Sequence, residues 1–262
     1  MTSIPRLTAT QCQRFMDSGR SFPALCGCAD QLGASAGEYV VKLRGTVDNR
    51  EAGLVNEFLA VKLAAHFGLT TPEPALIDLN QLLADLISDK FPALRGALQL
   101  SVGLNFGTKH LTGVSTWPVD KPIMEDQRAT AAEIFAFDAL LQNPDRQYDN
   151  PNLFVRDLTI FDHEAAFSFL LAVLPPVSPW AVDREQYLEK HVFYGRLKSK
   201  PIELEGFVAA LSGLSDELLD GIVSEVPPEW DNQSSMTRIV THLRAVRDHA
   251  EEFAGSIRRV LG

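Results

Sequence analysis

Three polar residues near the middle of the chain, Asp145, Asn150 and Asp162, have types and a spacing that could support phosphoryl transfer. A carboxylate can orient an attacking hydroxyl group or accept its proton, and the side-chain oxygens of Asn and Asp are ligands for Mg²⁺. Each residue taken alone is also what an ordinary turn prefers. Their order, with Asn five residues after the first Asp and the second Asp twelve residues later, favours the base and metal half of a phosphotransfer site.

We expect these three residues to lie where a helix and a short β-ribbon end. A helix over residues 128–142 finishes in an apolar run, and the proline after Asn143 pushes that residue out of the helical region. A polar loop follows. The segments 152–156 and 158–161 then predict a short two-stranded ribbon, which would deliver Asp162 at its far end.

A lysine and a glutamate earlier in the chain form a second candidate pair. The segment Glu38–Arg44 has the composition of a strand, and its apolar neighbours suggest that Lys42 points into a cleft. The helix expected over residues 51–67 carries Glu57 among apolar positions. A buried carboxylate is costly without a partner, and Lys42 is the obvious candidate. Helical geometry alone is equally compatible with a solvated Glu57.

A loop of small residues, 31–37, lies directly before the lysine strand and includes Gly33, Ser35 and Gly37. Small side chains can let backbone N–H groups approach phosphates, to which a nearby ammonium adds a point charge. The same composition is typical of a plain hairpin turn. Both interpretations remain open at this stage.

The overall composition sets limits on partners and location. The chain has 262 residues, enough for one large domain or for two lobes that share a cleft. Its net charge of −10 argues against a nucleic acid or an anionic membrane as the main partner. No apolar run reaches the about 18 residues that a membrane-spanning helix needs. The N-terminus has no secretory signal pattern, which we take as an expectation of a cytoplasmic protein.

The cysteine count points to the same compartment. Cys12, Cys26 and Cys28 make an odd number, with one tight pair. This pattern fits a reducing cytoplasm better than a disulfide framework, and a metal site there would need a fourth ligand from elsewhere.

The remaining segments predict an α+β fold. Strands are expected over residues 72–79 and 96–106, and helices over 82–87, 183–197, 203–211, 215–225 and 234–261. The basic residues of the last helix, His242 among them, are interpreted as a solvated face. A β-rich front and a helical back suggest an N-lobe of residues 1–107 and a C-lobe of residues 108–262.

The order of these features resembles the HipA-like kinases and, more distantly, the phosphatidylinositol 3-/4-kinases. The resemblance covers about residues 30 to 170. Its most specific motifs are Asn143-Pro144-Asp145-Arg146-x-x-x-Asn150 and Phe161-Asp162-His163. Members of this group carry an Asp-Arg pair with Asn five residues after the Asp, and a later metal-binding Asp.

The resemblance implies a two-lobed, protein-kinase-like fold and a role for each candidate residue. Asp145 would be the catalytic base, and Asn150 and Asp162 would hold Mg²⁺. Lys42 would bind the ATP phosphates with support from Glu57. The loop residues Gly33, Ser35 and Gly37 would lie near the same phosphates, and Ser35 would be a candidate for autophosphorylation.

The function that the resemblance implies is an ATP- and Mg²⁺-dependent serine/threonine protein kinase in the cytoplasm. Its partner would be a protein substrate, with an antitoxin-like protein as a second candidate partner, and it would make no direct contact with nucleic acid or membrane. Two other functions stay open. Aminoglycoside phosphotransferase relatives phosphorylate small molecules with a similar Asp and Asn, but they usually have His where this chain has Asn143. A catalytically silent nucleotide-binding scaffold is the third possibility.

Overall fold

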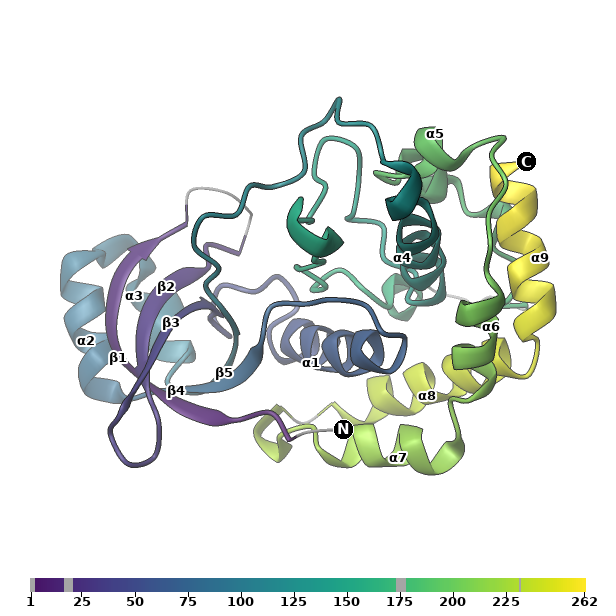
Figure 1. Cartoon of the computed structure of the whole chain (residues 1–262). Helices are drawn as coiled ribbons and strands as arrows, with labels where there is room; N and C mark the ends of the chain where they lie inside the picture. Colours follow the sequence, from purple (N-terminus) through teal and green to yellow (C-terminus); the bar gives the residue numbers. More distant parts are fainter. Residues whose placement is uncertain (1–2, 17–20, 173–177, 231) are drawn as a thin grey trace. The chain divides into compact units, whose positions relative to one another are not determined.

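The computed structural model describes residues 3–16, 21–172, 178–230 and 232–262. These residues form two compact units. Unit 1 comprises Met1–Phe58, Pro72–Gly113 and Val226–Asn232, and unit 2 comprises Leu59–Thr71, Val114–Glu225 and Gln233–Gly262. The division falls within helix α1 (Glu51–His66). The N-terminal part is rich in strands and the C-terminal part is helical, which confirms the predicted α+β class (Figure 1). The lobes 1–107 and 108–262 stay a prediction.

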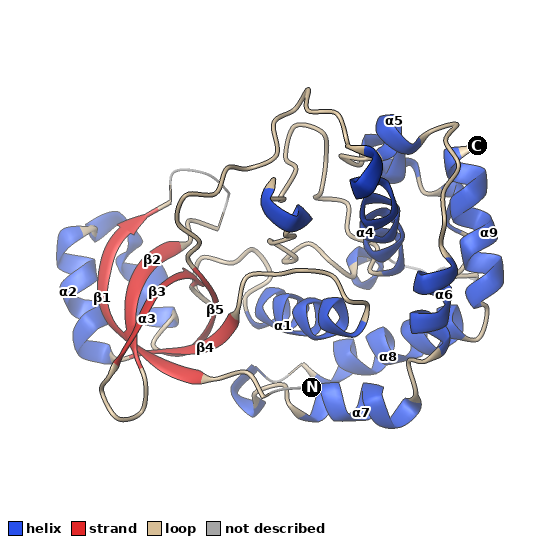
Figure 2. Ribbon diagram, in the orientation of Figure 1, coloured by secondary structure: helices blue, strands red, loops and turns tan. Residues whose placement is uncertain are grey.

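The strands of unit 1 form a closed barrel in the order β1-β2-β3-β5-β4 (Figure 2). The strands are β1 (Arg6–Phe15), β2 (Ala24–Ala29), β3 (Ser35–Lys42), β4 (Pro74–Leu79) and β5 (Gly103–Lys109). Neighbouring strands are antiparallel except β1 and β4, which pair in parallel where Arg6–Thr8 meet Leu76–Asp78. Beyond this closing contact, β1 has two irregularities in its register with β2, between Ala9 and Gln11 and between Cys12 and Arg14.

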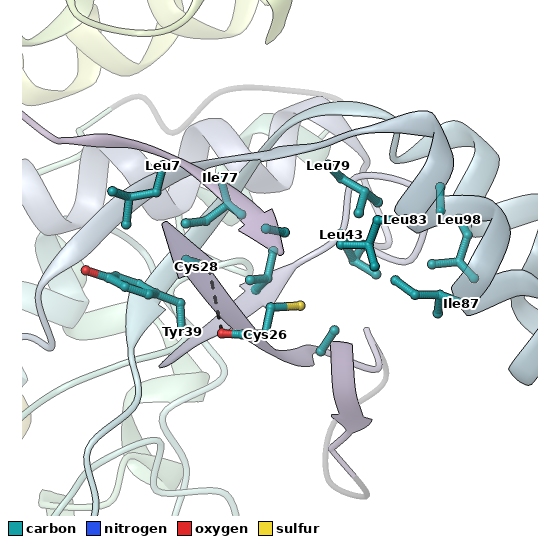
Figure 3. Close-up of a cluster of buried hydrophobic side chains, with 14 of the residues drawn as sticks. Leu7, Cys26, Cys28, Tyr39, Leu43, Ile77, Leu79, Leu83, Ile87 and Leu98 are labelled. Carbon is teal, nitrogen blue, oxygen red and sulfur yellow. Dashed lines mark hydrogen bonds between the residues drawn. The ribbon is translucent and has the colours of Figure 1, made fainter. Parts of the chain in front are cut away.

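The core of unit 1 fills the barrel and extends under two helices. Leu7, Tyr39 and Ile77 of the strands belong to the same cluster as Leu83 of α2 (Gln81–Lys90) and Leu98 of α3 (Arg95–Leu100), and Leu43 and Leu79 lie at the end of the cluster nearest these helices (Figure 3). Cys26 and Cys28 belong to this core and carry free thiols. Burial raises the pKa of the Cys28 thiol to about 11, so this cysteine behaves as a small apolar side chain.

The strand predicted over residues 96–106 is wrong in its first half. Residues 95–100 form α3, and β5 begins at Gly103, whose φ of 99° is in the left-handed region that favours glycine. The alternating pattern misled the prediction because α3 buries only one face, through Leu98, against the barrel. Gly45 explains how closely the helix approaches: a Cβ there would lie 2.0 Å from the carbonyl oxygen of Ala97.

Unit 2 is built around α4 (Arg128–Leu140), whose residues from 134 to 140 are all buried. The unit also contains the end of α1 from Leu59 onward and the helices α5 (Tyr194–Leu197), α6 (Glu205–Ser212), α7 (Asp216–Ser224), α8 (Gln233–Arg247) and α9 (Ala250–Leu261). Helix α9 packs against α6, and α7 packs against α8 (Figure 1). In the part of the chain that the structure describes, no helix is long and apolar enough to cross a membrane.

Two helix predictions in unit 2 need correction. Residues 183–197 do not form one helix but two short 3₁₀ turns, Val182–Arg184 and Gln186–Lys190, followed by α5. The helix predicted over 234–261 is interrupted between α8 and α9, where the backbone of His249 leaves helical geometry. The ring of His249 stacks on that of Trp180, with 3.7 Å between the ring centroids.

His242 also contradicts the predicted solvated basic face. Its side chain is buried, and its Nε2 donates a hydrogen bond of 2.8 Å to the carbonyl oxygen of Leu140. Burial lowers the pKa of His242 to about 4, so the ring is neutral near pH 7. Arg244 of α8 and Arg259 of α9 lie outside the core and form surface ion pairs with aspartates.

Candidate functional site

A buried ion pair in unit 1 joins the strand lysine to the helix glutamate. Lys42 is the last residue of β3, and its Nζ lies 2.8 Å from Oε1 of Glu57 on α1. The side chains are only 10% and 3% exposed. The pairing suggested by the sequence therefore exists, and the solvated alternative for Glu57 is wrong. Helix α1 is buried on nearly all sides from residue 53 to residue 64, so this carboxylate is shielded from bulk water.

The loop between β2 and β3 has the internal bonding of a tight hairpin turn. The backbone N–H groups of Leu32 and Ala34 each donate to Oδ1 of Asp30 at 2.9 Å. The N–H group of Gly33 donates to the carbonyl oxygen of the same aspartate at 3.0 Å. The three backbone N–H groups that could bind a phosphate in this loop therefore already donate hydrogen bonds to Asp30.

The other two predicted loop residues lie on β3. Ser35 is exposed at the start of the strand, and Gly37 has a φ of 93° that favours glycine. A Cβ at Gly37 would lie 2.9 Å from Nζ of Lys109, which donates to the carbonyl oxygen of Ala36. The glycine is explained by its backbone conformation, since the lysine tip could move aside. Contact of Gly33, Ser35 and Gly37 with a nucleotide stays a prediction.

In unit 2, two amide side chains hold the carboxylate of Asp145. Nδ2 of Asn150 donates to its Oδ2 at 3.1 Å, and Nδ2 of Asn152 donates to the same oxygen at 2.9 Å. The backbone N–H group of Asp145 donates to Oδ1 of Asn143 at 3.2 Å. The loop from residue 143 to residue 152 is therefore organised around Asp145. We call it the Asp145 loop.

The Asp145 loop rests on a buried carboxylate at the end of α4. Asp138 is fully buried and accepts hydrogen bonds from Nδ2 of Asn143 at 2.9 Å, Nε of Arg146 at 2.6 Å and Nε2 of His191 at 3.0 Å. Burial opposes the ionisation of Asp138, but Arg146 and His191 outweigh it and lower its pKa below the ordinary carboxyl value. The charged carboxylate thus fixes both ends of the turn that carries Asp145.

His191 completes this support as a neutral ring. Its Nδ1 accepts a hydrogen bond from the backbone N–H of Phe193 at 3.1 Å, so the proton resides on Nε2, which faces Asp138. Burial lowers the pKa of His191, although Asp138 partly opposes the shift. The negative charge of Asp138 is therefore balanced by Arg146 alone.

The predicted ribbon after the loop exists in a shorter form. Leu153 pairs with Ile160 in an isolated bridge, and backbone N–H groups of Phe154 and Phe161 donate across to Thr159 and Asn152. A 3₁₀ turn, Arg156–Leu158, replaces the start of the second predicted strand. The carbonyl oxygens of Asn152 and Phe161 both accept from Nη1 of Arg146. Arg146 thereby ties the Asp145 loop to the residue that precedes Asp162.

Left-handed backbone conformations cluster around these residues. Gln142, Asn152, Asp162 and Phe167 have φ angles of 46°, 43°, 59° and 58°. Such conformations cost free energy for residues other than glycine, although Asn and Asp tolerate them best. Strained backbone of this kind gathers at functional sites, where surrounding contacts hold it in place. The cluster marks the region from Gln142 to Phe167 as the candidate active site of unit 2.

A family model for HipA-like kinases matches residues 10–254. This chain belongs to the HipA-like kinase family. The fold of this HipA-like kinase is similar to the crystal structure of the Helicobacter pylori proinflammatory kinase CtkA, with a TM-score of 0.54 over 98% of both chains and a sequence identity of 14%. No curated protein matches the chain significantly. Family membership supports a kinase-type phosphotransferase, and the structural neighbour supports the mixed α+β fold.

The kinase has a donor set that suits a hard cation. Because Nδ2 of Asn150 donates to Asp145, Oδ1 is the atom of this exposed amide that could bind a metal ion. Asp162 supplies a partly exposed carboxylate. Oxygen ligands of this kind are what Mg²⁺ prefers. No group of three or more His, Cys, Asp or Glu side chains in the described residues could hold a metal ion, so a site here would depend on the amide oxygen.

Sequence reasoning missed three residues that support the kinase site: Asp138, Asn152 and His191. A signal existed for Asp138, because an aspartate inside the apolar run of a buried helix requires buried partners. Asn152 follows Asn150 by two residues, but it was assigned only to a strand. His191 lies in a segment interpreted as a continuous helix, and no pattern linked it to the Asp145 loop.

Proposed function

We propose that this HipA-like kinase is a two-lobed, ATP- and Mg²⁺-dependent enzyme that phosphorylates serine or threonine hydroxyl groups of a protein. The single observation that supports this most is the ion pair between Lys42 and Glu57. In protein kinases a strand lysine paired with a helix glutamate orients the ammonium toward the ATP phosphates. A buried ion pair does little for stability compared with apolar residues, which favours a functional reason for it here.

The residues of unit 1 would bind the nucleotide. Lys42 offers a positive charge held by Glu57, which suits phosphate oxygens. Gly33, Ser35 and Gly37 are proposed to lie near the phosphates. The loop N–H groups could then bind phosphate oxygens only after their present hydrogen bonds to Asp30 break. Mass spectrometry after incubation with Mg·ATP tests Ser35 directly. Phosphate on this residue supports its placement, and unmodified Ser35 in an active preparation rejects autophosphorylation.

The residues of unit 2 would bind the acceptor and the metal ion. Asp145 would orient the acceptor hydroxyl and take its proton as the oxygen bonds to the γ-phosphorus, and the bond from phosphorus to ADP breaks. Asn150 and Asp162 would hold Mg²⁺, which when bound neutralises charge that develops on the phosphates. Asn152 would keep the Asp145 carboxylate in position through its hydrogen bond of 2.9 Å.

The experiment that tests the proposal is transfer of labelled γ-phosphate from Mg·ATP to the protein itself and to a cell lysate. Wild type is compared with Asp145→Asn and with Asp149→Asn. Asp149 is an exposed carboxylate of the same loop and provides a matched control. We expect label on protein with wild type and Asp149→Asn, and a loss of at least about 100-fold with Asp145→Asn. Addition of EDTA should abolish transfer.

The alternatives have distinct outcomes in the same experiment. ATP consumption without a labelled protein would indicate a small-molecule acceptor. ATP binding without any transfer would indicate a scaffold. Equal activity of wild type and Asp145→Asn would refute the role of Asp145. An antitoxin-like partner stays a prediction, which co-purification of a stoichiometric protein from the native host would support.

A further inference from the structure

Beside the Asp145 loop, unit 2 has a pocket with a volume of about 470 Å³. One wall is Tyr148, which belongs to the loop and is 47% exposed. The other walls come from residues 119–122, 189–192 and 194–196. All of these segments belong to unit 2. The pocket contains neither Asp145 nor the proposed metal ligands, so the site described above does not account for it.

Backbone hydrogen bonds join the pocket wall to the Asp145 loop. The N–H group of Tyr148 donates to the carbonyl oxygen of Lys190 at 3.0 Å, and the N–H group of Val192 donates to that of Arg146 at 3.1 Å. Gln147 and His191 form a bridge between them. The segment 190–192 therefore lies alongside the loop, and a molecule in the pocket would be held at a fixed position relative to Asp145.

The pocket keeps its shape through the side chain of Arg196. This guanidinium donates to the carbonyl oxygens of Val119, Lys121 and Val192, and lies 5.7 Å from the ring centroid of Tyr148. The hydroxyl group of Tyr148 in turn donates to Asp120 at 2.9 Å. A ring held at both its face and its hydroxyl group is pre-organised, which lowers the entropy lost when a partner binds.

The charge of the pocket is opposite in sign to that of the chain. Three residues with cationic side chains, Lys121, Lys190 and Arg196, and two with carboxylates, Asp120 and Glu189, line the pocket, whereas the whole chain has a net charge of −10. The hydrogen bonds described for Arg196 go to neutral carbonyl oxygens, and its charge is opposed in part by Asp120, which lies close enough to interact with it. The formal charge of the lining still has an excess of one positive charge. A positive pocket on an acidic protein selects an anionic partner through electrostatic complementarity.

The distance from Asp145 favours a polypeptide as the occupant. Tyr148 is three residues from Asp145 in the same loop, and three residues of extended chain span at most about 10 Å. A peptide can place a hydroxyl group at Asp145 and a second side chain in the pocket when the two residues are about three positions apart. A small alcohol does not reach both places at once.

We propose that this pocket binds an acidic side chain of the polypeptide that the kinase phosphorylates. The kinase then selects serine or threonine residues that have Asp or Glu within about three positions. This inference rests on the proposed function, because it names the substrate class of the same site.

The test uses peptides that each carry one central serine or threonine. A single flanking position, from four residues before the hydroxyl residue to four after it, is fixed in turn as Asp, Ala or Lys. The ratio of kcat/KM for the Asp peptide to that for the Lys peptide is measured with Mg·ATP for wild type, Lys190→Glu, Lys121→Glu and Lys200→Glu. Lys200 is an exposed lysine of unit 2 outside the pocket and serves as the matched control. A ratio within one variant does not depend on how much of it is folded.

We expect wild type and Lys200→Glu to prefer Asp by about two- to fivefold at one or more positions, as a partly exposed ion pair allows. Lys190→Glu and Lys121→Glu should remove or invert the preference, and about 0.5 M NaCl should weaken it in wild type. Equal use of Asp, Ala and Lys peptides would overturn the inference alone, as would a preference that both pocket variants retain. Transfer to no protein or peptide at all would overturn the proposed function, and this inference with it.

Discussion

Replacement of Asp138, the buried aspartate that binds the Asp145 loop, tests what holds the active-site geometry. In Asp138→Asn, the new amide presents an N–H group where Arg146 and His191 now donate to an ionised oxygen. Arg146 is 1% exposed and would keep a buried charge with its carboxylate partner removed. Breaking a buried ion pair in this way costs about 3–5 kcal/mol. We expect the free energy of unfolding to fall by that amount at pH 7.

The activity of Asp138→Asn should fall as well, because the turn that carries Asp145 loses its anchor. Asn143 and Arg146 flank Asp145, and both donate to Asp138. A displacement of about 1 Å at a reacting group can cost about 100-fold in rate. Phosphate transfer measured at a temperature where the variant is still folded, as judged by circular dichroism, separates this loss from unfolding.

The sign of the pH dependence follows from the lowered pKa of Asp138. A carboxyl group whose pKa is lower in the folded state contributes stability above its unfolded pKa of about 3.9, and this contribution is lost as the pH falls through the folded value. The difference between wild type and Asp138→Asn should therefore be full at pH 7 and shrink well below pH 4.

Urea unfolding is the assay, with Glu125→Gln as the control. Glu125 pairs with Arg128, but its side chain is 79% exposed, and such surface pairs contribute at most about 1 kcal/mol. If Asp138→Asn loses no more stability than Glu125→Gln, Asp138 does not anchor the loop through its charge, and the reasoning is wrong.

Three further predictions concern other parts of the chain. Lys42→Met should abolish phosphate transfer and destabilise unit 1 by about 3–5 kcal/mol, because Glu57 would stay buried without its partner. The double variant Lys42→Met/Glu57→Met should regain the stability, measured by urea unfolding, but not the activity. Between pH 6.5 and pH 4, His242 should lower the free energy of unfolding of wild type by about 3 kcal/mol, because burial lowers its pKa to about 4 while the unfolded ring binds a proton below pH 6.5. In urea titrations at each pH, His242→Gln should show a fall that is smaller by this amount, and the buried His191, whose pKa is also lowered, should account for part of the fall that remains. Gly45→Ala should cost about 1–3 kcal/mol in thermal unfolding, since its Cβ would lie 2.0 Å from the carbonyl oxygen of Ala97.

Each of these predictions has a control and a contrary result. An active double variant of Lys42 and Glu57 would show that the ion pair serves the fold alone. His110→Gln should keep the pH slope, and the same slope in His242→Gln would assign it to other groups. Gly96→Ala is the control for Gly45, because nothing lies within 4 Å of a Cβ there. A loss of stability as large at Gly96 as at Gly45 would rule out the contact with Ala97.

The sequence predicted the candidate site residues better than the buried residues that hold them in position. The Lys42–Glu57 pair could be predicted because two charges in apolar surroundings have to satisfy each other. The Asp138 network joins residues 53 positions apart in the chain, and such a network follows from tertiary packing rather than from local pattern. Periodicity therefore identified the helix that carries Asp138 but not what that aspartate binds.

The phosphate loop shows a different limit of the sequence. The interpretation of residues 31–37 as a phosphate loop rests on their place directly before the lysine strand, yet two connecting segments precede Lys42 in the barrel. The earlier segment, between β1 and β2, also has small residues, Gly19 and Ser21, and residues 17–20 lie outside the described part of the chain. Composition does not distinguish the two segments, since both satisfy the same preferences.

The irregular register of β1 has a consequence for association between copies of the protein. Only Arg6–Thr8 of this strand pair with β4, so its later residues have their described ladder partner on one side, in β2. An edge of this kind can template the addition of a foreign strand, which begins aggregation. The two register shifts after Thr8 bend and twist the strand in this stretch. A straight β-strand from another molecule would find few consecutive donors and acceptors in line, so the barrel is protected from edge-to-edge growth at the place where its closure is weakest.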